Sequence, residues 1–352
     1  MILKIGALIL LLGAIKMLYS SVAKNVISVE TPIDQAWWEG LSEEWKTILL
    51  INQNFSKQHT DIYAVQNGYI NRMNAKGQDD HYEMNTSLHN LNNERDFKLS
   101  YDDFYTRALK YKFVTANQHI DLATLGNLDI IYMVNGPGDL NPLKKFPNLK
   151  ILVLNSCGID LANAIRSPAL NLEPIRNLKK LQVLECSAHL LHSIEPIENL
   201  TSLRELRIES SKVTDLSPLK KLVNLEKLSV RTNAKSASAI SDLIALKVLH
   251  LDGVKKILNL SKLKNLKNLL ICEDELAITD GSYRIKSIDF LSSLQNLEYL
   301  DLEYTSYRGD LSQLDGLQNL KAITLPDISR SDMSAFKDHH RDCIIINAYR
   351  YE

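Results

Sequence analysis

A leucine repeat with a period of about 22 residues is the feature that most limits how this chain can fold. Nine anchor leucines follow one another at steps of 20 to 23 residues, apart from two longer steps of 32 and 31 residues. In every unit the residues at offsets −3, 0, +3 and +5 from the anchor are apolar. A period of this kind is typical of repeat proteins, whose units pack only on their neighbours. The anchors are Leu128, Leu149, Leu181, Leu203, Leu225, Leu246, Leu266, Leu297 and Leu320.

The spacing within each unit indicates one short β-strand. Offsets +3 and +5 lie two residues apart, so their side chains point to one face of a strand, while those at +2, +4 and +6 point to the other. One strand cannot bury its apolar face alone, and stacked units build a parallel sheet over a continuous core. Helix-hairpin repeats need more than about 30 residues. The period therefore excludes them and predicts an α/β repeat fold.

The residue pattern of the repeats resembles that of a known family. Residues 214–222 (TDLSPLKKL) followed by 224–230 (NLEKLSV) are similar to the leucine-rich repeats of bacterial internalin-like proteins. The resemblance covers about residues 120–348. It implies a curved solenoid with the parallel sheet on its concave face and short helices or irregular turns on its convex face. The family's inward asparagine at offset +8 is matched by Asn233, and Cys157 is a recognised variant, so we expect an incomplete ladder of buried hydrogen bonds.

The segments around the repeats, which we assign to residues 108–326, look like caps. In the predicted cap region 31–107, Thr31 and Pro32 start a short helix that ends at Gly40, and Ser42 starts a second helix running to about Asn52. The apolar face of these helices should cover the first repeat, although its tryptophans could instead anchor a partner. Its members are Trp38, Leu41, Trp45, Ile48, Leu49 and Asn52.

At the other end, residues 327–352 have the pattern of a capping repeat. A helix is predicted from Ser331 to His340, followed by a final strand at 343–347. Two insertions, at 160–171 and 273–286, account for the two long steps between anchors. In a solenoid, insertions map to loops on one face.

Residues 1–23 have the features of a signal peptide or an N-terminal membrane anchor. Lys4 precedes an apolar run from Ile5 to Ile15, and Ser21-Val22-Ala23 is a small-x-small pattern before Lys24. The charge of Lys16 stands against a cleaved signal peptide, and if its side chain reaches the membrane interface, residues 5–22 could instead be a retained anchor. A buried or frayed helix of a cytoplasmic protein is the third alternative. We expect a secreted or cell-envelope protein with possible membrane attachment through this segment.

No known catalytic, cofactor or metal motif occurs in the chain. The 41 Lys and Arg balance 42 Asp and Glu, which argues against a nucleic-acid partner. The cysteines in and beside strands are expected to be buried and inert. The group at 79–89 is expected to be a solvated loop rather than a metal site. The group at 339–343 is a similarly weak candidate, because the adjacent side chains of His339 and His340 would point apart on a helix.

The concave face, at offsets +2, +4 and +6, is the predicted binding surface for a protein partner. In the first three repeats it is apolar, so it is either a contact site or covered by the N-terminal segment. Further on it carries alternating charges and then tyrosines. The alternatives are a glycan bound by the tyrosines and, more remotely, a secreted effector enzyme with a cysteine nucleophile. The predicted contact residues are Glu205, Arg207, Glu209, Lys227, Arg231, His250, Asp252, Tyr299, Asp301, Glu303, Tyr304 and Tyr307.

Overall fold

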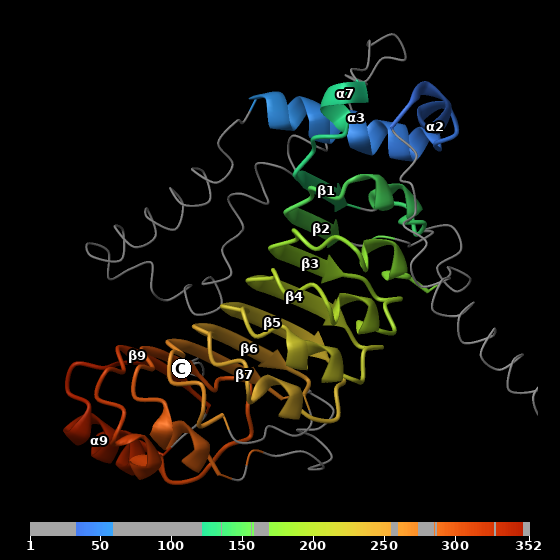
Figure 1. The fold of residues 1–352 in the computed structure, drawn as a ribbon. Helices are drawn as coiled ribbons and strands as arrows, with labels where there is room; N and C mark the ends of the chain where they lie inside the picture. The colour runs from blue at the N-terminus through green and yellow to red at the C-terminus, as the bar shows by residue number, and fades with distance from the viewer. Residues whose placement is uncertain are drawn as a thin grey trace, which may run out of the picture.

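The computed structural model describes residues 33–58, 122–134, 136–155, 157, 169–254, 260–273, 285, 287–326 and 329–347. Over these ranges the chain forms a 10-stranded parallel sheet in the order β1 to β10. Figure 1 shows the strands stacked as a curved ladder with the N-terminal helices at one end. The curved solenoid with a parallel sheet is therefore confirmed.

The strands pair at the steps that the leucine anchors predict. Ile130 lies opposite Ile151, which lies opposite Val183 across the first insertion. The same agreement holds along the whole sheet. The strands are β1 (Ile130–Val134), β2 (Ile151–Asn155), β3 (Val183–Ser187), β4 (Glu205–Ser210), β5 (Lys227–Thr232), β6 (Val248–Asp252), β7 (Asn268–Cys272), β8 (Tyr299–Asp301), β9 (Ala322–Leu325) and β10 (Ile344–Asn347).

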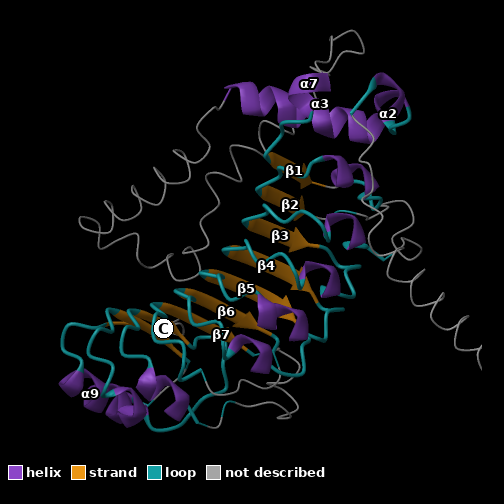
Figure 2. Ribbon diagram, in the orientation of Figure 1, coloured by secondary structure: helices purple, strands orange, loops and turns teal. Residues whose placement is uncertain are grey.

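Short 3-10 turns return the chain from one strand to the next, and Figure 2 shows them stacked along one side of the sheet. In six of the seven turns of the described chain, a polar side chain two residues before the first residue of the turn accepts a hydrogen bond from the backbone N–H of that first residue; in the last turn, Asp310 accepts instead from Ser312 N. Asp215 Oδ1, for example, accepts from Ser217 N at 2.8 Å. The turns are η2 (Asn141–Lys145), η3 (Glu173–Ile175), η4 (Glu195–Ile197), η5 (Ser217–Lys221), η6 (Ser238–Ile240), η7 (Asp289–Ser293) and η8 (Leu311–Leu314). The face of the sheet turned away from them is the concave face.

The expected inward position at offset +8 is wrong for the middle repeats. Asn233 is only half-buried, whereas Thr232 before it is buried. Strands β4 and β5 extend to offset +7, so the alternation of faces continues and turns Ser210 and Thr232 inward. Offset +8 is buried at Cys157 and Thr305.

An asparagine ladder exists at another position, one residue before the anchor. Asn224 Nδ2 donates to the Thr201 carbonyl of the preceding repeat at 2.8 Å. The same bond recurs from Asn265, Asn296 and Asn319 to Ile244, Lys264 and Gln295. These amides join neighbouring repeats at the beginning of their strands.

The N-terminal cap consists of α2 (Gln35–Glu39), α3 (Glu43–Gln58) and the short α7 (Leu122–Leu125). The predicted start of the first helix at Thr31 is wrong, because Asp34 is its N-cap and accepts from Trp37 N at 2.8 Å. Gly40 ends α2 as predicted. Ser42 precedes α3 as predicted, but α3 continues past Asn52 to Gln58.

The cap closes the free edge of the sheet. Trp45 is buried and its indole Nε1 donates to Asp139 O at 2.9 Å. Asn52 Oδ1 accepts from Tyr132 N at 2.9 Å and its Nδ2 donates to Tyr132 O at 3.1 Å. The amide of Asn52 therefore replaces a neighbouring strand at the edge of β1. Trp38 and Trp45 are part of the core, as expected for a cap.

The C-terminal cap is α9 (Arg330–His339) followed by β10. Its N-cap is Ser329, whose Oγ accepts from Asp332 N, so the helix starts before the predicted Ser331. The α9 residue Phe336 is buried. The ring of His340 stacks on the Phe336 ring, with 4.4 Å between the two ring centroids. The final strand is confirmed.

Several predictions fall outside the described residues. They concern residues 1–23, the histidines near 79–89 and most of both insertions. Within the described ranges, no helix combines the length and the apolar character that crossing a bilayer requires.

Candidate partner-binding face

The middle of the concave face is a lattice of charged and polar side chains. Because the strands pair in register, side chains at equal offsets form rows across β4, β5 and β6. Glu205 and Lys227 share one row, and Glu209, Arg231 and Asp252 share another. All five were predicted from the repeat register, and the structure brings them together.

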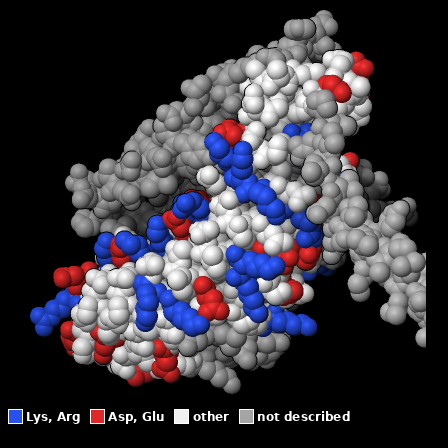
Figure 3. Space-filling view, in the orientation of Figure 1, with Lys and Arg blue, Asp and Glu red and all other residues white. Residues whose placement is uncertain are grey.

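The guanidinium of Arg231 lies between two carboxylates. Its Nη1 donates to Glu209 Oε1 at 2.9 Å and its Nε to Asp252 Oδ2 at 2.6 Å. A separate ion pair joins Lys227 Nζ to Glu205 Oε1 at 2.8 Å. Arg207 lies 3.6 Å from the Glu209 carboxylate. Figure 3 shows that basic and acidic groups are interspersed on the side in view.

These contacts set the ionisation of the face. Partial burial alone would raise the pKa of Glu209, but the charges of Arg231 and Arg207 and the hydrogen bonds to Arg231 and Ser187 lower it below its usual value. Burial would likewise lower the pKa of Arg231, and its bonds to Asp252 and Glu209 raise it instead. Both shifts favour the charged forms of Glu209 and Arg231 at neutral pH.

The apolar side chains at the N-terminal end of the concave face are buried. Ile130, Tyr132, Ile151 and Val153 are all buried. Their burial agrees with the expectation that this apolar end is covered. Glu185 on β3 is also buried and lies opposite Arg207 in register. Glu185 was not among the predicted contact residues, although its offset of +4 places it on the concave face.

At β8 the predicted contact residues divide into two groups. Tyr304 is 41% exposed, and Tyr299 and Glu303 are half-buried. Asp301 and Tyr307 are buried, so the prediction that they line the surface is wrong. Strand β8 ends at Asp301, whose Oδ1 accepts from Glu303 N, and the chain then turns into the core. Tyr307 donates from its hydroxyl to Asp310 O at 2.9 Å there.

The cysteines have the environment of structural residues. Cys157 and Cys186 are buried and free, so the disulfide that their adjacent repeats could allow is absent. Burial raises the pKa of the Cys157 thiol to about 12 and also raises that of Cys186. His340, in the group at 339–343, hydrogen-bonds through Nε2 to Leu314 O at 3.0 Å.

Sequence comparison agrees with the geometry of the repeats. Residues 130–338 match the model of a family described as a leucine-rich repeat region. The chain belongs to the leucine-rich-repeat family. This fold supports protein interaction in general. None of the curated proteins matches the chain.

Several solved leucine-rich-repeat structures are similar. Internalin C2 of Listeria monocytogenes is 20% identical, covering 65% of this chain and 84% of its own, with a TM-score of 0.40. The protein LIC12759 of Leptospira interrogans is 20% identical over 58% of this chain and 56% of its own, with a TM-score of 0.43. Internalin F of Listeria monocytogenes is 16% identical over 70% and 94%, with a TM-score of 0.30.

Proposed function

We propose that this leucine-rich-repeat chain is a non-catalytic module that binds a protein partner on its concave face between β4 and β8, in the cell envelope or outside the cell. The charged lattice around Arg231 is the observation that carries the proposal. Its side chains are partly exposed, regularly spaced and held by ion pairs. The location follows from the features of residues 1–23.

A lattice of this kind favours selective binding. A parallel sheet fixes the backbone, and ion pairs fix the side-chain heads, so little conformational entropy is lost when a partner binds. Alternating charges reject surfaces whose charges do not match, which gives specificity more than affinity. The exposed ring of Tyr304 adds an apolar contact of the type found at binding hot spots.

A charge swap tests the proposal without breaking the fold. Glu205 and Lys227 form an isolated pair, because Val183 and Val248 flank them in their row. The double variant Glu205→Lys with Lys227→Glu keeps an ion pair but reverses the pattern that a partner meets. We expect affinity capture from the envelope fraction, read by mass spectrometry, to lose a protein that the wild type retains.

The matched control lies on the turn side of the sheet. Lys262 and Asp242 form an exposed ion pair there at 2.6 Å. The swap Lys262→Asp with Asp242→Lys should leave capture unchanged. If the swap at Glu205 and Lys227 retains every captured protein, the concave face is not the binding surface.

A further inference from the structure

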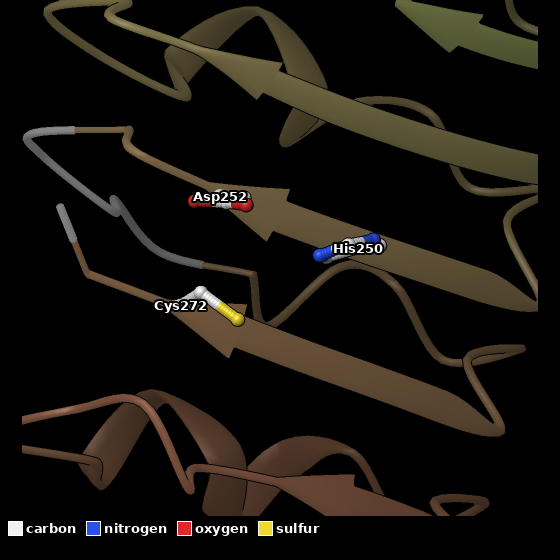
Figure 4. A group of neighbouring side chains, drawn as sticks. All are labelled: His250, Asp252 and Cys272. Atoms are coloured by element: carbon white, nitrogen blue, oxygen red, sulfur yellow. The ribbon is translucent and has the colours of Figure 1, made fainter. Parts of the chain in front are cut away.

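Three side chains of metal-binding type meet on the concave face where β6 and β7 pair. Asp252 lies directly opposite Cys272 in register, and His250 precedes Asp252 by two residues on the same face. One nitrogen, one carboxylate oxygen and one sulfur of these residues all lie within 4.8 Å of one another, and each residue is half-buried. Figure 4 shows His250 and Asp252 on β6 and Cys272 on the adjacent β7.

We propose that His250, Asp252 and Cys272 form a site for Zn²⁺, with three protein ligands and an open fourth position. A mixed set of nitrogen, oxygen and sulfur donors suits Zn²⁺, whereas Mg²⁺ and Ca²⁺ take oxygen ligands. Around a tetrahedral Zn²⁺ these donors would lie roughly 3.3–3.8 Å apart. The three donor atoms would therefore have to approach one another by about 1 Å to bind the ion, and rotation about side-chain torsions can supply this movement.

The neighbouring strand β5 already holds two of the ligands in place. Ser229 Oγ lies 3.1 Å from His250 Nδ1. In the tautomer whose Nδ1 donates to Ser229, the lone pair is on Nε2, which would bind the metal. Arg231 holds Asp252 through Oδ2, so the carboxylate can coordinate through Oδ1. Hydrogen bonds of this kind to ligating imidazoles and carboxylates are usual in metal sites.

The local charge favours a cation. The carboxylates of Asp252, Asp301 and Glu303 act electrostatically on the Cys272 sulfur, against one nearby guanidinium, that of Arg231. The sulfur therefore lies in a negative potential. In this potential the neutral thiol of Cys272 is favoured over the thiolate, and a bound Zn²⁺ would reverse that preference. The thiol proton would pass to solvent as the S–Zn bond forms.

Cobalt titration of the reduced, metal-free full chain tests the site. We expect Co²⁺ to give a thiolate-to-cobalt absorption band, and Zn²⁺ to displace the Co²⁺ because it binds such sites more tightly. Cys272→Ser should abolish the band. His250→Gln should weaken Zn²⁺ binding at least about tenfold, and Ser229→Ala should weaken it by about 10- to 100-fold. Cys343→Ser, which changes a cysteine outside the cluster, should bind as the wild type does.

Unfolding curves keep the result interpretable if a variant is unstable. Zn²⁺ should raise the unfolding temperature of the wild type and of Cys343→Ser but not that of Cys272→Ser or His250→Gln. The proposal is overturned if Co²⁺ gives no thiolate band, or if the band and the Zn²⁺ affinity survive in Cys272→Ser. The two proposals share Asp252, but the swap at Glu205 and Lys227 tests protein binding away from this cluster, so the two can fail separately.

Discussion

At the scale of single residues, the surroundings of the four cysteines decide what they can do. Burial raises the pKa of Cys157 to about 12 and of Cys343 to about 11. It also raises the pKa values of Cys186 and Cys272. A nucleophilic cysteine needs the opposite shift, because the thiolate is the reactive form. The environments of these thiols therefore favour a module without a cysteine nucleophile.

Alkylation rates at pH 8 test this conclusion. A free thiol with a pKa of about 8.5 is partly ionised at that pH, whereas a thiol with a pKa near 12 is ionised to roughly one part in ten thousand. We expect Cys157 in the folded, metal-free chain to react with iodoacetamide at least about a thousandfold more slowly than a free thiol, as read by peptide mass spectrometry. In urea all four cysteines should react alike. A cysteine that outpaces a free thiol in the folded chain would revive the enzyme hypothesis.

At the scale of elements, the main problem of this fold is how its sheet ends and how its units are joined. An uncovered strand edge is a template for pairing with another chain. The edge of β1 is covered by one side-chain amide, because that of Asn52 hydrogen-bonds both the backbone N–H and the carbonyl of Tyr132. Between repeats the solution is the asparagine ladder of Asn224, Asn265, Asn296 and Asn319.

Replacement of Asn52 by alanine should expose the edge of β1. Two buried backbone groups would lose their partner, which we expect to lower the free energy of unfolding by about 2–4 kcal/mol. Urea unfolding measures that loss, and light scattering should show concentration-dependent association through the open edge. Asn127→Ala removes an exposed amide on the same cap, bonded to Ala123 O, and should change neither quantity. Equal stability of Asn52→Ala and wild type would show that the cap does not depend on this amide.

The ladder position of the sixth repeat is occupied by Ala245 instead of asparagine. Asn265 of the next repeat bonds the Ile244 carbonyl, and the corresponding carbonyl for position 245 is that of Val223. We therefore expect Ala245→Asn to add a bond and raise the free energy of unfolding by about 0.5–1 kcal/mol. Asn265→Ala is the reverse control and should lower it by a similar amount. If both changes are neutral, the ladder does not contribute to stability.

How far the sequence predicts these elements depends on how strongly burial constrains each residue. The apolar period of the repeats predicts the nine strands β1 to β9, because a slip of one residue would turn leucines such as Leu206 out of the core. The start of α2 was missed because Asp34 and Thr31 are both good N-caps in sequence. The burial of Tyr307 was missed because the strand β8 ends early, and the alternation of faces ends with it. His250 and Cys272 lie far apart in sequence, so only the strand register brings them together.

At the scale of the whole molecule, the near-zero net charge is a balance of paired groups rather than an absence of charge. The sum over the chain is −1, yet the concave face holds a lattice of ion pairs centred on Arg231. Each ion pair between neighbouring repeats, such as that of Arg231 with Glu209, stabilises the interface between those two repeats. The stability of a solenoid is approximately the sum of its units and their interfaces. Protonation at one interface should therefore affect the unfolding of the whole array.

Glu209 is the group with which to measure this effect. Its pKa in the folded chain lies below its usual value, so the unfolded chain takes up the proton more readily as the pH falls. The stabilisation is thus fully present above the unfolded pKa of about 4.3 and is lost as the pH falls through the folded value. We expect Glu209→Gln to lower the free energy of unfolding by about 1 kcal/mol at pH 7, and the difference from wild type to shrink as the pH falls through the folded pKa of Glu209.

Urea unfolding at intervals between pH 7 and pH 3 checks this prediction. Asp242→Asn removes the carboxylate of an exposed ion pair with Lys262 on the turn side, which contributes little to stability. Its stability should therefore remain close to that of the wild type at pH 7. Curves for wild type and Glu209→Gln that stay parallel down to pH 3 would contradict the prediction. The concave lattice would then serve recognition alone, because its ion pairs would add nothing to the joining of repeats.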